Sequence, residues 1–169
     1  HAQTDEIVFT SGGTEGNNLA LFGVLRANPK NKHFIVGATE HHSVLAAARA
    51  LAKDGAALTI LSCDAYGRYQ PDDLLRAIRP DTALVSLQLA NNDTGVLQPI
   101  AQIGAITRGR RIPLHCDAVA AYGHIPIDIE ALKIDLLTTS AHKFGGPRGI
   151  GFLFVRNEMP INPLFLAGR

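Results

Sequence analysis

Short apolar runs that alternate with helix-forming stretches constrain this chain more than any other feature of its sequence. The runs are rich in Val, Ile, Leu and Phe, and each stops at glycine, proline or small polar residues, as buried strands do. They lie at residues 6–10, 33–37, 57–61, 82–89, 112–118, 134–137 and 150–156. Strands that alternate with helices predict an α/β fold, with a mostly parallel, doubly wound sheet and helices on both faces.

The stretches between the runs carry signals for the starts and ends of helices. Thr14 and Ser43 are suited to cap the first two helices, and Gly55 is suited to end the second. Pro71 at a first helical position opens the third, and Pro80 stops it. The predicted helices cover residues 14–25, 44–52, 71–78 and 99–111, with a further short helix before residue 134.

Composition is that of a well-buried globular protein. Of 169 residues, 46% are hydrophobic and 18% are charged, and the net charge of +1 indicates neither a nucleic-acid nor a membrane partner. No apolar run approaches the ~20 residues that span a bilayer. Residues 1–5 lack the features of a signal peptide, and Cys63 and Cys116 have neither metal-ligand nor disulfide spacing, so we expect a cytoplasmic protein. Residues 166–169 carry no closing signal, so we also expect a piece of a longer protein.

Candidate functional residues follow the apolar runs at the points where these end. They are Gly13 and Thr14, His41, Asn92, Asp117, and the segment from Ser140 through His142 to Lys143. Open α/β sheets bind ligands at the edge where the carboxyl ends of their strands meet. The sequence therefore predicts that these residues converge on one site.

Lys143 stands just past the run at 134–137, before a turn rich in glycine and proline. An amine held among apolar and small residues is desolvated, so its pKa falls and its neutral form can attack a carbonyl. This pattern predicts a lysine that forms a Schiff base. The alternative is an ordinary solvated lysine on a surface loop.

The segment Gly12-Gly13-Thr14 joins a predicted strand to a predicted helix. The unpaired N–H groups and the positive dipole end of a helix can hold a phosphate, and glycine allows close approach. The alternative is plain capping by Thr14, with Glu15 in the first turn. The segment fits neither a Walker loop nor a strict dinucleotide fingerprint.

Two further positions leave alternatives open. His41 and His42 are adjacent, but neighbouring side chains point in different directions and no third ligand lies at a useful local spacing, so we predict no metal site. Asp117 ends an apolar run, where a carboxylate is costly unless a cation pairs with it. A protonated pyridine nitrogen is such a cation. The alternative is an aspartate that caps a helix.

Several motifs resemble those of the class V aminotransferase family, and within it those of the cysteine desulfurases. Their order along the chain also matches the family. Ser-x-His-Lys and Gly-Gly-Pro-x-Gly at residues 140–149 resemble the lysine segment that binds pyridoxal phosphate (PLP). Further matches are Glu-His at 40–41, Asn-Asn at 91–92 and Asp-Ala at 117–118. The resemblance implies the fold type I of PLP-dependent transferases, like aspartate aminotransferase. It also implies that residues 1–169 are the central part of the large domain, without its N-terminal segment and the C-terminal small domain.

The resemblance implies a role for each site residue. Lys143 bonds the cofactor and moves a substrate proton, and His41 lies over the cofactor ring. Asn92 reaches the phenolic oxygen, and Asp117 keeps the ring nitrogen protonated. The implied cofactor-binding residues are Gly13, Thr14, His41, Asn92, Asp117, Ser140, His142 and Lys143, of which Lys143 and His41 are also catalytic.

The implied activity takes sulfur from L-cysteine and gives alanine and an enzyme persulfide, for iron–sulfur cluster assembly or other sulfur transfer. A homodimer and a sulfur-acceptor or scaffold protein are the implied partners. Two departures stand out: Ala120 replaces the family's glutamine, and neither Cys63 nor Cys116 matches the persulfide cysteine, so Cys116 is expected in the core. The alternatives are another PLP enzyme of this fold (a selenocysteine lyase, sulfinate desulfinase or small-amino-acid aminotransferase) or a truncated, non-catalytic paralogue.

Overall fold

The computed structural model describes residues 2–30 and 32–166, so His1 and residues 167–169, on which the expectations about the two ends partly rest, lie outside it. The described part is built on a seven-stranded sheet in the order β1-β7-β6-β5-β4-β2-β3. The strands are β1 (Ile7–Thr10), β2 (His33–Gly37), β3 (Ala57–Leu61), β4 (Thr82–Gln88), β5 (Leu114–Asp117), β6 (Leu136–Thr138) and β7 (Gly151–Val155). Every predicted strand is formed.

The sheet is mostly parallel, as predicted. The strands from β3 to β6 pair in parallel, and β7 is antiparallel to both β6 and β1. Every residue of β2 and of β4 is buried, because these central strands have helices on both faces. This explains why their sequences read as continuous apolar runs.

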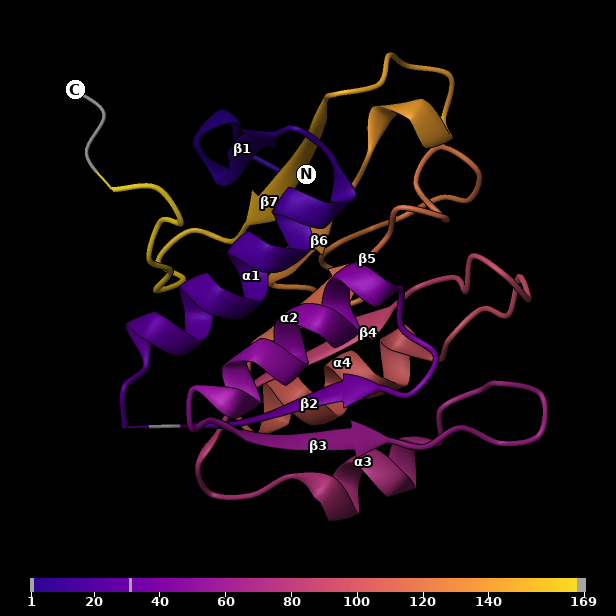
Figure 1. Cartoon of the computed structure of the whole chain (residues 1–169). Coiled ribbons are helices and arrows are strands. Elements are labelled where there is room, and N and C mark those ends of the chain that lie inside the picture. Colours follow the sequence, from indigo (N-terminus) through magenta and orange to yellow (C-terminus); the bar gives the residue numbers. More distant parts are fainter. Residues whose placement is uncertain (1, 31, 167–169) are drawn as a thin grey trace.

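Helices cover both faces of the sheet (Figure 1). They are α1 (Gly13–Ala27) and α2 (His42–Lys53) on one face, and α3 (Pro71–Ala77) and α4 (Ile100–Gly109) on the other. Successive strand residues point to opposite faces. Phe34 therefore packs in the cluster beneath α1 and α2, whereas Ile35 packs in the cluster beneath α3 and α4. None of the helices in the described ranges is long and apolar enough to cross a membrane.

The first two helices begin earlier than the sequence predicted. Gly12 is the N-cap of α1, so the alternative interpretation, in which Thr14 caps this helix, is wrong. His41 is the N-cap of α2, where its Nδ1 accepts the backbone N–H of Ser43 at 3.2 Å. An imidazole nitrogen thus takes the place of the expected serine oxygen. As a result, both helix starts lie close to the edge where the strands end.

The short helix predicted before β6 is not formed. Instead, Asp128 Oδ1 accepts the backbone N–H groups of Glu130 and Ala131, at 2.9 and 3.1 Å, and makes a single turn. Lys133 then has a φ of 56°, in the left-handed region, which an α-helix cannot continue through. Two short 3₁₀ turns occur elsewhere, η1 (Thr4–Glu6) and η2 (Ala141–Lys143).

A buried polar cluster ties the turn after β2 to β4. Glu40 Oε1 accepts the backbone N–H of Gln88 at 2.8 Å and the hydroxyl of Tyr69 at 3.1 Å. Tyr69 is fully buried, and its oxygen also accepts the backbone N–H of Thr39 at 3.2 Å. Gly37 makes room for this ring, because a Cβ there would lie 2.0 Å from the tyrosine oxygen. The cluster holds the loop before α2 in place.

Glu40 should make stability depend on pH. Burial raises the pKa of Glu40 well above its ordinary value of 4.5, so the folded state keeps a proton that the unfolded state releases. Its contribution to stability is therefore complete below about pH 4.5 and is lost as the pH rises toward the folded-state pKa. We expect the free energy of unfolding of the wild type, minus that of Glu40→Gln, to fall by up to about 1.4 kcal/mol per pH unit above pH 4.5.

Urea unfolding at a series of pH values measures this difference. The two proteins share every other titrating group, including the buried His115, so the subtraction leaves Glu40 and its coupling to neighbours such as Asp117. Parallel pH profiles for the wild type and the variant would contradict the prediction.

Candidate functional site

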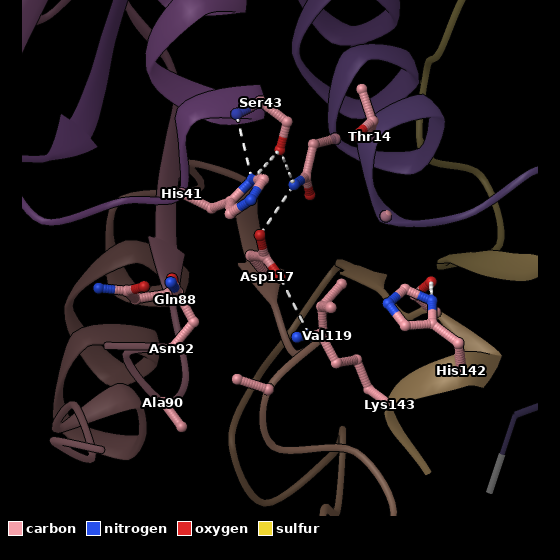
Figure 2. Close-up of a pocket in the computed structure, with 14 residues that line it drawn as sticks. Thr14, His41, Ser43, Gln88, Ala90, Asn92, Asp117, Val119, His142 and Lys143 are labelled. Atoms are coloured by element: carbon pink, nitrogen blue, oxygen red, sulfur yellow. Dashed lines mark hydrogen bonds between the residues drawn. The ribbon is translucent and has the colours of Figure 1, made fainter. Parts of the chain in front are cut away.

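The residues singled out at the strand ends line one cavity of about 300 Å³ at the carboxyl edge of the sheet (Figure 2). Its lining includes Gly13, Thr14, His41, Asn92, Asp117, Ser140, His142 and Lys143. These residues come from the start of α1, which follows β1, from the end of β5, and from the turns that follow β2, β4 and β6. The structure thus brings all of the predicted site residues together.

One side of the cavity can hold a small anion. The amino end of α1 begins there, and helix starts present N–H groups and a positive dipole end. Ser140 is buried beside this turn, since a Cβ at Gly12 would lie 3.3 Å from its oxygen. The same oxygen is 2.9 Å from His142 Nδ1. Glycine at 13 matters as well, because a Cβ there would lie 2.7 Å from a methyl of Val119. We call residues 12–14, Ser140 and His142 the anion cradle.

Asp117 forms the floor of the cavity. Only 5% of its surface is exposed, and burial raises the pKa of its carboxyl, against the effect of two hydrogen bonds. These bonds come from the backbone N–H of Val119 at 3.0 Å and the amide of Asn17 at 2.8 Å. No helix follows β5 directly, so the helix-cap interpretation of Asp117 is wrong. Among the described residues, no lysine or arginine forms a salt bridge with this carboxylate.

His41 lies across the cavity from the anion cradle (Figure 2). Its ring stacks on that of His42, with centroids 4.8 Å apart, so the expectation that the two side chains point apart is wrong. The reason is that His41 caps the helix with an extended ψ of 147°, which turns its ring over the first helical residue. Within residues 2–30 and 32–166, no three metal-ligating side chains gather in one place.

Lys143 ends the short turn η2, and its side chain lines the cavity. It is exposed, so the expected desolvation of its amine is wrong for the described part of the protein. The apolar residues that precede it are buried within β6, whereas the loop beyond Ala141 projects past the edge of the sheet. His124 Nε2 lies 2.8 Å from the backbone oxygen of Lys143 and helps to hold this loop.

The two neighbouring asparagines, Asn91 and Asn92, have different roles. Asn91 is buried and shapes the turn: its Nδ2 donates to the oxygen of Thr39 at 2.9 Å, and its Oδ1 accepts the N–H of Thr94 at 2.8 Å. Asn92 is exposed and lines the cavity, where its amide donates to Asp93 at 2.8 Å. Asn92 is therefore the member of the pair that can meet a ligand.

Sequence reasoning missed three polar residues of the cavity, Asn17, Gln88 and Ser43, the last of which was predicted only as a helix cap. Asn17 lies one helical turn after Gly13 and so on the same face of α1, which is a signal that the sequence does contain. Gln88 is the only amide in the mostly apolar run at 82–89, and it pairs with Asp117 in the sheet register. The cavity is also lined by Ala90, Val119 and Ala120.

Neither cysteine lies in this cavity. Cys116 is fully buried in the core, as predicted, and burial raises the pKa of its thiol, with the charges of Asp117 and Glu40 adding to the effect. Cys63 is half-buried and pairs with Tyr69 in an isolated β-bridge. A buried, protonated thiol such as Cys116 is a poor nucleophile.

The model of a known family, described as aminotransferase class-V, matches residues 1–169. The chain belongs to the class V aminotransferase family. This confirms the family that the motifs at residues 40–41, 91–92, 117–118 and 140–149 predicted.

The curated relatives that match this chain include cysteine desulfurases. The chain is 48% identical over 168 residues to the cysteine desulfurase IscS of Methanosarcina thermophila, covering 99% of this chain and 42% of that protein. It is 48% identical over 171 residues to the mitochondrial cysteine desulfurase of Saccharomyces cerevisiae, covering 99% and 34%. The chain thus spans less than half the length of these relatives.

Solved structures confirm the predicted fold. The structure named SspA in complex with cysteine superposes with a TM-score of 0.95 at 37% identity, covering 99% of this chain and 49% of that one. DndA from Streptomyces lividans superposes with a TM-score of 0.90 at 37% identity, covering 97% and 48%. The described sheet and helices therefore match fold type I class V proteins.

Proposed function

We propose that this chain forms the cofactor-binding core of a PLP-dependent cysteine desulfurase. The observation that carries the proposal is the make-up of one cavity: a buried carboxylate at the floor, an anion cradle on one side and a lysine at the rim. These are the three groups that a pyridine nitrogen, a phosphate and an aldehyde require. The cysteine desulfurase relatives support the choice of reaction.

The residues present fit PLP. The buried carboxylate of Asp117 has no salt-bridge partner among the described lysines and arginines, and a protonated ring nitrogen would supply the missing cation. The anion cradle would hold the phosphate. Lys143 would bond the aldehyde carbon, His41 would lie against the ring, and Asn92 would donate to the phenolic oxygen. When bound, PLP supplies an electron sink for negative charge at the substrate's Cα.

The chain's own residues would then perform three tasks. Asp117 would keep the ring nitrogen protonated, which is the state that draws electrons best. The amine of Lys143 would take the proton from the substrate's Cα and return it. His41, at the opposite wall, would donate a hydrogen bond toward the bound substrate or ring. Because Ala120 stands at the position of the family's glutamine, Asn92 would be the amide that donates to the phenolic oxygen.

The substrate and partners belong to the same proposal. We assign L-cysteine as the substrate, alanine as the product and a persulfide on a cysteine other than Cys63 or Cys116. The relative solved in complex with cysteine supports the substrate. A homodimer, a sulfur-acceptor or scaffold protein for iron–sulfur cluster assembly, a cytoplasmic location, and a place in the middle of the large domain follow from the same family resemblance.

The test is addition of PLP to the purified protein that carries this chain. We expect a visible absorption band that survives gel filtration, and we expect borohydride to trap the cofactor covalently. Pyridoxal, which lacks the phosphate, should be retained far less well because it leaves the anion cradle unfilled. Incubation of the loaded protein with L-cysteine should release alanine. Absence of a retained band would overturn the cofactor assignment; a band without alanine would overturn the substrate.

A further inference from the structure

Asn17 is the most deeply buried polar side chain in the lining of the cavity, and no step above uses it. It lies on α1, is 1% exposed, and both hydrogens of its amide are engaged. One donates to Asp117 Oδ2 at 2.8 Å and the other to Ser43 Oγ at 2.9 Å. These partners belong to β5 and α2, so one amide joins three elements of the site.

The orientation of this amide follows from its partners. Turned the other way, Asn17 would set its oxygen against the Asp117 carboxylate and leave the amide hydrogens buried without an acceptor. In the observed orientation its Oδ1 has no hydrogen-bond partner among the described residues. A buried acceptor left unpaired costs about 1–3 kcal/mol. The observed orientation is therefore the more stable one, because the two bonds donated by the amide outweigh the bond that Oδ1 lacks.

The link continues from Ser43 to His41. Because Ser43 Oγ accepts the hydrogen of Asn17, its own hydrogen is free for His41 Nδ1, which lies 2.8 Å away. The backbone N–H of Ser43 points at the same nitrogen, at 3.2 Å. Two donors converge on Nδ1, so this nitrogen must be the unprotonated one. A neutral His41 therefore carries its proton on Nε2.

We propose that Asn17 is a positioning residue that, through Ser43, fixes His41 as the Nε2–H tautomer and couples it to Asp117. Figure 2 shows the whole path as dashed lines, from Asp117 through the amide to Ser43 and His41. His41 then meets a ligand in the cavity as a hydrogen-bond donor and not as a base. That consequence for a bound cofactor rests on the proposed function, whereas the link itself does not.

The tautomer of His41 is directly measurable in the protein without cofactor, from the ¹⁵N shifts of the imidazole nitrogens, with His41→Gln to assign them. We expect the Nε2–H form in the wild type. Ser43→Ala removes the hydroxyl that bonds His41 and accepts from Asn17, and Asn17→Leu removes both bonds that the amide donates. In each, the ratio of the Nδ1–H to the Nε2–H form should rise about three- to tenfold, the effect of one net hydrogen bond.

Matched variants separate this role from simple packing. Asn18→Leu changes the neighbouring asparagine, which bonds only to the backbone of its own helix, and should leave the tautomer as in the wild type. Ser43→Thr keeps the hydroxyl and should do the same. An unchanged tautomer ratio in Ser43→Ala, or a wild type protonated on Nδ1, overturns the proposal; if Asn17→Leu does not fold, Ser43→Ala decides. The tautomer is measured without PLP, so a result that overturns this proposal is distinct from a failure to retain the cofactor.

Discussion

Replacing Lys143 with alanine will abolish the covalent trapping of PLP by borohydride and lower the turnover of L-cysteine by at least about 10²–10⁴-fold, the contribution typical of a positioned proton-transfer group. The fold itself should not suffer. Lys143 is exposed, and substitutions at such positions usually change stability by no more than about 0.5 kcal/mol. Its loop is held through its backbone oxygen by His124, and alanine retains that contact.

Lys53→Ala is the matched control, because Lys53 is an exposed lysine in the last turn of α2, away from the cavity. It should trap cofactor and turn over cysteine like the wild type. Mass spectrometry of the borohydride-treated proteins locates the modified lysine, and thermal unfolding checks that both variants fold alike. Trapping that persists in Lys143→Ala would show that another amine bonds the cofactor.

Gly37→Ala should lower the free energy of unfolding by about 3–5 kcal/mol. Substitutions of exposed residues usually change it by no more than about 0.5 kcal/mol. The added Cβ would lie 2.0 Å from the oxygen of Tyr69 and 2.2 Å from its Cζ. Overpacking of a core costs about 1–3 kcal/mol, and the displaced hydroxyl would also lose its bonds to Thr39 and Glu40, at about 1 kcal/mol each. The buried ring cannot turn aside, since Tyr69 is fully enclosed.

Denaturant unfolding of the wild type, Gly37→Ala and Gly109→Ala measures this effect. Gly109 ends α4 with nothing within 4 Å of its added Cβ, so alanine there should be neutral or slightly stabilising. Equal midpoints for the two alanine variants would contradict the prediction, because they would show that Tyr69 and its partners Thr39 and Glu40 rearrange at little cost.

The sequence predicted the sheet well because its signals are local. Each strand is a short apolar run that ends in glycine, proline or a polar turn, and such runs remain visible even where both faces are buried. The convergence of His41, Asp117 and Lys143 followed from one rule, that parallel strands end at the same edge. No contact between distant residues was needed for either inference.

The remaining features depend on contacts that no local pattern encodes. Asn17 and Asp117 are 100 residues apart in sequence, yet they share a hydrogen bond. Lys143 has apolar neighbours along the chain but lies beyond the sheet edge in space, so the sequence predicted a burial that is not found. The predicted short helix before β6 is absent because Lys133 takes a left-handed conformation, which its residue type does not predict.

The pairing of β1 with β7 has a consequence for the order in which the site is completed. Within the described part, β1 joins the sheet only through β7, and the two strands lie side by side at its edge (Figure 1). Gly151 in β7 also approaches Gly12 closely: a Cβ at 151 would lie 3.0 Å from the Cα of Gly12. On the ribosome, β1 and residues 12–14 emerge long before residues 151–155, and until then β1 has no described strand to pair with. Residues 12–14, one part of the anion cradle, are thus synthesised well before the strand that completes their surroundings.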